Sequence, residues 1–302
     1  MQPSARDAIT RFVFERDPVR GAWVTLDAAS RAILECHPYP PALRRVVAEL
    51  LAASTLLAST LKFTGSLIVQ LQGSGPVRLL VVECTDALEL RATAQWDAQR
   101  TADAGADATL AELAGGAAHG RLVITLDSRG NGTLYQGIVT LETTSVASLI
   151  EHYLATSEQL PSRLVLATDG GRAAGLLLQR LPGAGTTDES GPDDAWSRSD
   201  ARMSELDPLL LLAPGTAQAL LAQSFPHDDV RMFEPKPVAC RCSCSRERVE
   251  RALRIAGTAE VESILAERGA VEVTCEFCNR SYVFAPLEAR AVFAPNASSA
   301  RH

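Results

Sequence analysis

The stretch Cys240-Arg-Cys242-Ser-Cys244, near the end of the chain, is followed further along by Cys275-Glu-Phe-Cys278. These two stretches contain five of the seven cysteines in the chain. Two close groups of thiols, separated by a small domain's worth of sequence, can bring four sulfur atoms to one tetrahedral ion with Zn–S bonds of roughly 2.3 Å. The sequence therefore predicts a small C-terminal domain that folds around one zinc ion.

The alternative for these cysteines is a pair of structural disulfides, which would require an oxidising compartment. The residues from Met1 to Asp7 lead into mixed polar and charged sequence, without the basic and apolar regions of a secretory signal. We therefore expect a cytoplasmic protein. A disulfide between residues i and i+2 is strained and easily reduced, so a Cys-x-Cys pair suits a reversible switch. Cys240 and Cys242 form one such pair, Cys242 and Cys244 another, and spacing alone leaves both open.

Length and charge limit the other possibilities. The 302 residues are enough for one sizeable core and a smaller module, and 46% hydrophobic against 22% charged residues is typical of a globular protein. No apolar run reaches the roughly 18 residues of a membrane span. The net charge of −7 argues against a nucleic-acid partner. The part from Val238 onward carries nine Lys/Arg and eight Asp/Glu, so it is no basic patch.

Residues 1–182 show runs of strands followed by helices without regular alternation, which indicates an α+β domain. We expect a mixed or antiparallel sheet packed with helices. Strand-like segments are Asp7–Leu26 (a hairpin), Ser66–Leu71, Val77–Val82, Leu88–Ala92, Leu122–Leu126 and Tyr135–Leu141. Helices are expected at Pro41–Leu61, Ser145–Ser157 and Ala173–Leu181, and a short apolar element at Arg163–Ala167.

Residues 183–237 form the predicted helical linker. Its start, Gly183 to Asp200, has the composition of an exposed boundary, with Trp196 as an isolated aromatic residue. The linker has ten Asp/Glu and four Lys/Arg, a net of −6, and apolar stretches that are too short to build a core. It is either a pair of ordinary helices packed permanently on the core or a metastable segment released by a trigger. The neighbouring cysteines favour the second interpretation. The zinc domain is predicted at 238–288, and a disordered tail at 289–302.

Several motifs resemble one known family. Cys242–Arg248, Glu262–Gly269, Val271–Cys278 and Tyr282–Phe284 resemble the zinc centre of the redox-regulated heat shock protein 33 chaperones. Further segments are similar to that family's N-terminal core, so the resemblance covers nearly the whole chain. They are Arg20-Gly21, Leu61–Gly65, Gln70–Val77, Ser157–Pro161 and Gly175–Pro182.

The resemblance implies an ATP-independent holdase, inactive while reduced and zinc-bound, and active after oxidation, zinc release and linker unfolding. Its partners would be unfolding client proteins and, after oxidation, a second copy of the chain. Carried over, the zinc ligands are Cys242, Cys244, Cys275 and Cys278, one ion per chain. The implied disulfides are Cys275–Cys278 and then Cys242–Cys244. Cys240 departs from the family pattern and is either a competing ligand or an accessory, resolving thiol.

Two other functions fit the sequence less well. A thiol–disulfide oxidoreductase needs its Cys-x-x-Cys at a helix N-terminus, whereas Cys275 follows a strand-like segment. A zinc-ribbon regulator that binds nucleic acid needs positive charge that is missing. Cys36 and Cys84 are expected to be buried, inert thiols, and His37 beside Cys36 no catalytic base. We therefore expect no catalytic residues, no enzyme activity, and neither a nucleic-acid nor a membrane partner.

Overall fold

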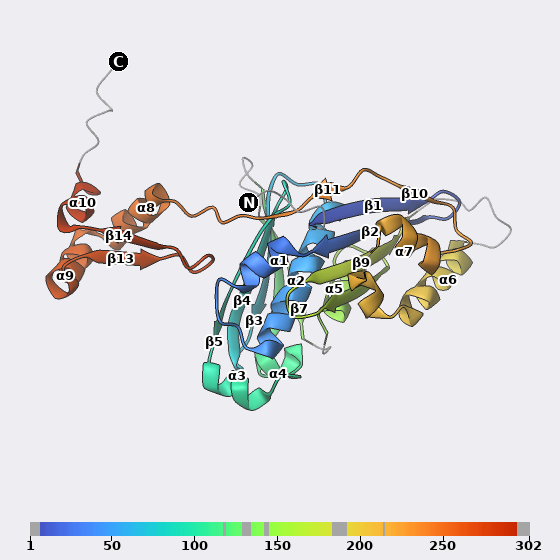
Figure 1. The fold of residues 1–302 in the computed structure, drawn as a ribbon, viewed down its shortest axis with the longest axis horizontal. Helices are drawn as coiled ribbons and strands as arrows, with labels where there is room; N and C mark the ends of the chain where they lie inside the picture. Colours follow the sequence, from blue (N-terminus) through green and yellow to red (C-terminus); the bar gives the residue numbers. More distant parts are fainter. Residues whose placement is uncertain are drawn as a thin grey trace, which may run out of the picture. The chain divides into compact units, whose positions relative to one another are not determined.

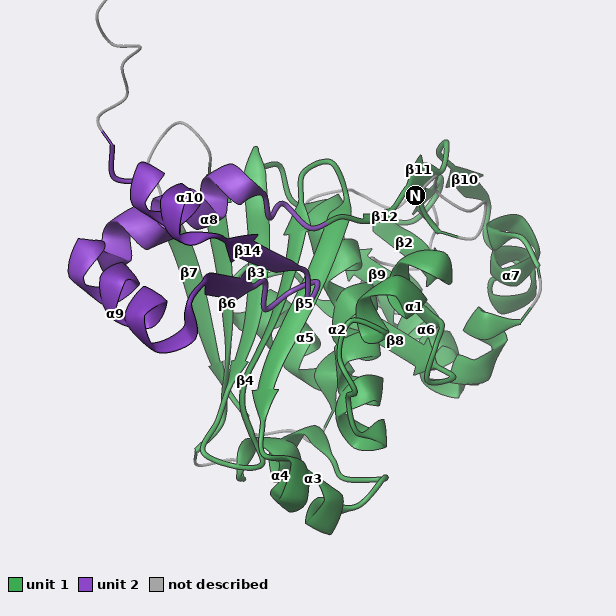
Figure 2. Cartoon of the chain, turned by 60° about the vertical axis from the view of Figure 1, so that its left-hand side comes forward, with its two compact units in different colours: residues 1–241 green, residues 242–302 purple. Residues whose placement is uncertain are grey.

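The structure, a computed structural model, describes residues 7–116, 119–128, 134–141, 145–182, 192–213 and 215–294. The chain divides into two compact units, Met1–Arg241 and Cys242–His302 (Figure 2). The first residues of the predicted linker, 183–191, lie outside the described ranges. Among the described helices, none combines the length and the apolar character that a membrane crossing requires.

The first sheet of unit 1 is antiparallel and has the strand order β10-β1-β2-β9-β8, with β11 also paired to β1. The predicted hairpin is confirmed, because Ile9 of β1 lies opposite Val24 of β2. The strands are β1 (Ala8–Phe14), β2 (Val19–Leu26), β8 (Ser162–Thr168), β9 (Ala173–Arg180), β10 (Val230–Met232) and β11 (Lys236–Pro237).

The second sheet has the order β12-β5-β4-β3-β6-β7. Its strands are antiparallel except for β12, which runs parallel to β5, so the sheet is mixed as predicted. Alternating apolar residues place one face of these strands in the core. The strands are β3 (Gly65–Gln72), β4 (Val77–Thr85), β5 (Glu89–Trp96), β6 (Arg121–Ser128), β7 (Leu134–Thr140) and β12 (Ala239–Cys240).

Helix α2 (Pro41–Thr60) contacts strands of both sheets and is buried on most faces, as its sequence predicts (Figure 1). Pro41 begins the helix, where its missing N–H is no loss. The predicted α5 (Val146–Thr156) also packs in this core. Three short helices were not predicted from the sequence: α1 (Ala28–Leu34), α3 (Ala98–Ala104) and α4 (Leu110–Ala114).

The predicted helix at Ala173–Leu181 is wrong, because this segment is strand β9 in the middle of the first sheet. Leu177 faces the core around α2, whereas Leu176 and Leu178 belong to an apolar cluster on the opposite face. A strand that is buried on both faces has a continuous apolar run without alternation. Periodicity alone cannot distinguish such a run from a buried helix.

The linker covers that opposite face of the first sheet. Within its described residues it forms α6 (Pro192–Glu205), the 3₁₀ helix η1 (Pro208–Leu212) and α7 (Ala217–Ser224), before β10 and β11. The predicted exposed boundary is therefore corrected from Pro192 onward, since Ala195 is buried and Trp196 packs against the cluster. We call this cluster the linker interface. Its buried residues are Phe12, Phe14, Val19, Ala167, Ala174, Leu176, Leu178, Met203, Leu211, Leu220, Leu221 and Phe225.

Unit 2 packs three helices around a two-stranded antiparallel hairpin. Val249 and Leu253, one turn apart on the first helix, turn toward Val261 and Leu265 on the second. The hairpin closes this small core with Phe284. The elements are α8 (Arg246–Ala256), α9 (Thr258–Arg268), β13 (Val271–Thr274), β14 (Ser281–Phe284) and α10 (Pro286–Ala291).

Both predicted ends of the zinc domain are shifted. Residues 238–241 belong to unit 1, because Val238 is fully buried in its core and Cys240 lies on β12. At the other end, Ala289 and Val292 are buried in the core of unit 2, so the packed structure extends beyond 288. The remainder of the predicted tail, 295–302, lies outside the described residues.

Candidate metal centre

Cys275 and Cys278 lie in the tight turn that joins β13 to β14. Cys275 N–H donates to the Arg280 carbonyl (2.9 Å), and Asn279 N–H donates to the Cys275 carbonyl (2.8 Å). Asn279 has a φ of 57°, in the left-handed region that asparagine tolerates better than most residues. The turn therefore brings the two thiols of Cys-x-x-Cys to the same side of the hairpin end.

Cys242 and Cys244 lie on the extended segment that leads into α8. Ser245 is the N-cap of this helix, and its hydroxyl accepts a hydrogen bond from Arg248 N–H (3.3 Å). The Arg248 guanidinium in turn donates to the Ser243 hydroxyl (2.6 Å). This local network fixes where the chain turns, immediately after the second thiol.

The structure brings together the four cysteines that the resemblance implied. The sulfur atoms of Cys242, Cys244, Cys275 and Cys278 all lie within 4.8 Å of one another. The close contacts run between the pairs, with 3.6 Å from Cys242 Sγ to Cys275 Sγ and 3.3 Å from Cys244 Sγ to Cys278 Sγ. Sulfur atoms at the corners of a tetrahedron with bonds of roughly 2.3 Å would be about 3.8 Å apart. The cluster could therefore hold one metal ion.

The electrostatics of the cluster are uneven. Tyr282 Oη donates a hydrogen bond to Cys244 Sγ (3.2 Å). Burial tends to raise the pKa of Cys244, but the hydrogen bonds from Tyr282 and the neighbouring thiols outweigh it and lower the pKa to about 7. Burial raises the pKa of Cys242 instead. Because a metal ion binds thiolates and displaces their protons, the cluster suits a thiophilic cation.

The other cysteines are not members of this four-sulfur group. Cys240 is on β12 opposite Leu90 of β5, packs against the core of unit 1, and is outside the four-sulfur group. Cys84 is fully buried, and burial raises its pKa to about 12, as expected of an inert thiol. Cys36 is only half buried, contrary to expectation, because it follows the end of α1, where its thiol donates to the Ala32 carbonyl (3.2 Å).

Sequence reasoning missed the contact between Tyr282 and Cys244. The two residues are 38 positions apart, and only the pairing of β13 with β14 brings the phenol back to the cysteines. The available signal was a tyrosine on the strand that follows a Cys-x-x-Cys turn, where a polar tip can reach the sulfur atoms. Loss of a group that hydrogen-bonds to a metal-ligating residue typically costs about 10–100-fold in metal affinity.

Fold and site together define a two-unit α+β protein with a four-cysteine centre in its C-terminal unit. The sequence profile described as Hsp33 protein matches residues 7–285. The chain therefore belongs to the Hsp33 family, which confirms the resemblance drawn from its motifs.

Two relatives and one solved structure illustrate the similarity. The 33 kDa chaperonin of Methylobacillus flagellatus is 42% identical over 293 residues, 95% of this chain and 94% of that protein. The 33 kDa chaperonin of Chromobacterium violaceum is 42% identical over 294 residues, covering 97% and 96%. A crystal structure of the 33 kDa chaperonin (heat shock protein 33 homolog) from Thermotoga maritima covers 95% of this chain and 97% of its own, with a TM-score of 0.77 and 21% identity. That likeness confirms the fold.

Proposed function

We propose that this chain is a redox-regulated, ATP-independent holdase that binds unfolded client proteins and prevents their aggregation. The observation that carries the proposal is the linker interface, where, among the described residues, the segment that precedes the cysteines covers an apolar face of the first sheet. A holdase binds unfolded clients through apolar surface. In this chain such a surface is buried beneath the linker, and release of the linker would expose it.

The linker forms a single layer of short helices over the sheet. Of its two helices, α7 contributes Leu220 and Leu221 to the interface, while α6 has a mostly polar sequence and contributes Met203. Leu209, in η1 between them, is 64% exposed. In all, the linker supplies five of the twelve buried side chains of the interface: Met203, Leu211, Leu220, Leu221 and Phe225. A single layer of short helices on the outside of a sheet belongs to the low-stability part of a structure, so it can open without unfolding the sheet beneath it.

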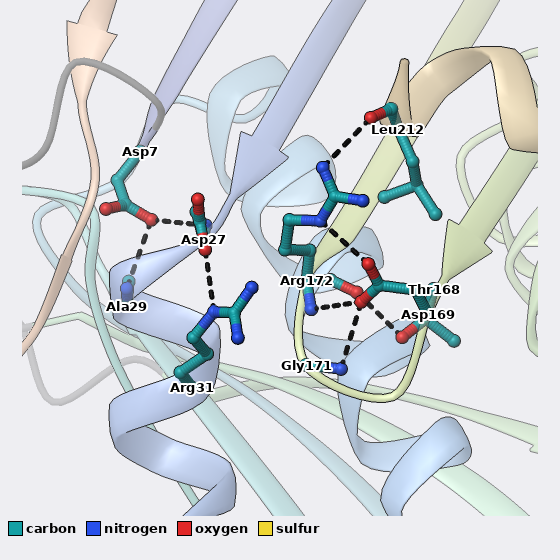
Figure 3. Close-up of polar contacts among 9 residues, drawn as sticks. All are labelled: Asp7, Asp27, Ala29, Arg31, Thr168, Asp169, Gly171, Arg172 and Leu212. Atoms are coloured by element: carbon teal, nitrogen blue, oxygen red, sulfur yellow. Dashed lines mark hydrogen bonds and ion pairs between the residues drawn. The ribbon is translucent and has the colours of Figure 1, made fainter. Parts of the chain in front are cut away.

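Two arginines of unit 1 add polar ties to the linker. Arg163 forms two parallel hydrogen bonds with Asp200 of α6, Nε to Oδ1 (2.6 Å) and Nη2 to Oδ2 (2.9 Å). Arg172, held by Asp169 in the β8–β9 turn, donates from Nη1 to the Leu212 carbonyl at the end of η1 (3.1 Å), as Figure 3 shows. These ties fix the register of the linker on the sheet.

The segment from the end of the linker to the cysteines, Phe233–Arg241, is hydrogen-bonded to the rest of unit 1. Phe233 N–H donates to the Arg11 carbonyl and Val238 N–H to the Asp7 carbonyl, each at 2.9 Å. The Asp7 carboxylate also accepts hydrogen bonds from Asp27 N–H and Ala29 N–H at the start of α1 (Figure 3). Arg241 N–H donates to the Leu90 carbonyl (3.0 Å), immediately before Cys242. Loss of structure at the cysteines would therefore begin at one end of this hydrogen-bonded segment, and the other end of the segment belongs to the linker.

The cysteines supply the proposed trigger. Zinc, when bound, would hold the four sulfurs as thiolates and contribute a binding free energy of about 10–16 kcal/mol. A whole domain is stable by only about 5–15 kcal/mol. Oxidation of Cys275 and Cys278 to a disulfide passes two electrons to the oxidant and removes two ligands, and the same reaction of Cys242 with Cys244 removes the other two. Unit 2 then retains only a small apolar core and should unfold.

The remaining parts of the proposal follow from this function. The partners would be partly unfolded client proteins and, in the oxidised state, a second copy of the chain, in the cytoplasm. Neither enzyme activity nor binding to nucleic acid or membranes is part of the proposed function. Cys275 follows β13 of a two-stranded hairpin rather than preceding a helix, so the arrangement does not favour a thiol–disulfide oxidoreductase.

The test is aggregation of a chemically unfolded protein, followed by light scattering without nucleotide. The chain is added either reduced and zinc-loaded or after oxidation with hypochlorous acid, which accepts the electrons and leaves chloride and water. Suppression of scattering by the oxidised form alone, with reversal by reductant, supports the proposal. Equal suppression by both forms, or by neither, contradicts it.

A further inference from the structure

A cationic hollow lies at the end of helix α2. The helix ends at Thr60, and Leu61 is already extended. A hollow of about 260 Å³ lies at this end of the helix beside β1 and β2, and Phe12 of the linker interface also lines it. Side chains that line it include Arg11, Arg20, Ser59, Lys62, Gln179 and Phe233.

Three of these side chains are cations, and no carboxylate lines the hollow. Within the described part of the chain, none of the three forms an ion pair with an acidic residue. Arg11 lies opposite Ala22 and Arg20 opposite Val13, so the two arginines are diagonal neighbours on one face of the hairpin. Diagonal neighbours lie about 7–8 Å apart, where like charges repel each other.

The position of Arg20 is fixed by a buried partner. Its Nε donates to Gln179 Oε1 (3.0 Å), and Gln179, which is 1% exposed, donates from Nε2 to the Ser162 hydroxyl (3.3 Å). Burial and the nearby charge of Arg11 both lower the pKa of Arg20, because each of them disfavours the charged guanidinium. A guanidinium held in one orientation by a neutral amide is a prepared donor for an anion.

The C-terminal end of helix α2 balances only part of the positive charge in the hollow. The C-terminal end of a helix carries roughly half a negative charge, and the last turn of α2 has no basic residue of its own. Ser59 and Thr60 partly satisfy this end by donating to the Leu56 and Leu57 carbonyls (2.7 and 2.9 Å). The half charge at the helix terminus therefore balances only a small part of the three positive side chains, and more than two positive charges remain unbalanced.

We propose that this hollow is a binding site for a phosphate group, either as the free ion or as the end group of a small molecule. A guanidinium presents its donors in a fork that matches phosphate oxygens, and a lysine adds a point charge. Arg11 and Arg20 come from adjacent strands and Lys62 from the segment after α2, so one anion can be contacted from three sides. The site is distinct from the cysteine centre and does not depend on the proposed holdase function.

Occupation of the site would act on the segment that precedes the cysteines. Phe233 lines the hollow, its N–H is bonded to the Arg11 carbonyl, and the Arg11 guanidinium lies 5.9 Å from the centre of its ring. A ligand that holds Arg11 would therefore also hold this segment against unit 1. We expect bound phosphate to stabilise the docked state and to delay release of the linker.

The test is calorimetric titration of the reduced full-length chain at constant ionic strength, with chloride as the background anion. Orthophosphate, methyl phosphate and pyrophosphate are the probes, because they distinguish a free ion from an end group and a single phosphate from a pair. Lys62→Gln and Arg11→Gln each remove one cation of the hollow. Arg78→Gln removes an exposed cation of β4 that does not line it, and is the matched control.

Saturable one-to-one binding of at least one probe is expected, weakened about tenfold or more by Lys62→Gln and by Arg11→Gln and unchanged by Arg78→Gln. Thermal unfolding of each variant without ligand confirms that the fold is retained. Absence of saturable binding at millimolar concentrations of all three probes would overturn the proposal. Equal weakening by the Arg78 variant would also overturn it, because the effect would then be one of net charge.

Discussion

The ring of Phe225, at the end of the linker helix α7, packs edge-on against the ring of Phe14 on β1. The ring centroids are 5.2 Å apart and the planes are inclined by 63°. Both side chains are buried, at 2% and 5% exposure. This edge-to-face pair joins the linker to the sheet at the centre of the linker interface, so the stability of the docked linker depends on it.

Phe225→Ala is expected to release the linker without oxidation. Truncation of a buried phenylalanine costs about 3–5 kcal/mol, which is large compared with the stability of a thin surface layer. The reduced, zinc-loaded variant should bind a hydrophobic dye and suppress aggregation. Leu209→Ala, at a residue that is 64% exposed, is the matched control and should behave as the unmodified chain. A reduced Phe225 variant that remains dye-negative would show that this contact does not hold the linker.

Asp200→Asn should weaken the docked linker by a smaller amount. The paired side chains of Arg163 and Asp200 are 35% and 33% exposed, so loss of the forked ion pair is worth about 1 kcal/mol. We expect linker proteolysis at a lower temperature and activation by less oxidant. Glu267→Gln, in a pair with Arg268 whose side chains are 73% and 72% exposed, changes the net charge by the same amount and is the control. High salt should reduce the difference between Asp200→Asn and the unmodified chain, because it screens the same attraction; a difference that salt leaves unchanged would contradict this explanation.

Zinc stoichiometry decides between the two possible cysteine centres. Cys240→Ser should leave one zinc per chain, because the Cys240 thiol lies outside the four-sulfur group. Cys244→Ser should abolish tight binding, since three sulfurs leave the tetrahedral set incomplete. Elemental analysis of both variants, purified under reducing conditions, makes this comparison. Loss of zinc from the Cys240 variant would instead assign that residue to the centre.

Tyr282→Phe should weaken zinc binding and hasten its release. The phenol donates to Cys244 Sγ at 3.2 Å, and loss of such a partner typically costs 10–100-fold in metal affinity. Competition with a chelator measures the affinity, and stopped-flow mixing with oxidant measures the release. Tyr135→Phe, on β7 of unit 1, is the control. An unchanged affinity in the Tyr282 variant would mean that the hydrogen bond has no effect on the centre.

Much of this fold could be predicted from local patterns. The alternating residues of β1 and β2 are typical of strands, and the three-and-four spacing in α2 is typical of a helix, so each pattern indicates one type of element. The prediction for strand β9 was wrong because both of its faces are buried, so its apolar residues form a continuous run without alternation. The start of unit 2 was placed too early because Val238 and Cys240 pair with strands far away in sequence, which no local pattern reveals.

The four-cysteine cluster was predictable because spacing puts two groups of thiols within reach of one ion, and the family resemblance selects Cys242 and Cys244 rather than Cys240 from the first group. The contacts around it were not, since Tyr282 reaches Cys244 only through the pairing of the β13–β14 hairpin. The cationic hollow was not predictable either. Its three charges come from β1, β2 and the end of α2, and each residue by itself resembles an ordinary surface cation.

The most direct test of the proposed switch follows zinc and activity in the same samples. Hypochlorous acid is added stepwise to the reduced, zinc-loaded chain, released zinc is measured with a chromogenic chelator, and suppression of aggregation is measured by light scattering. The proposed mechanism predicts that both rise together and that both reverse with reductant and zinc. Complete release of zinc without any suppression of aggregation would contradict it, because the cysteines would then stabilise unit 2 without controlling the linker.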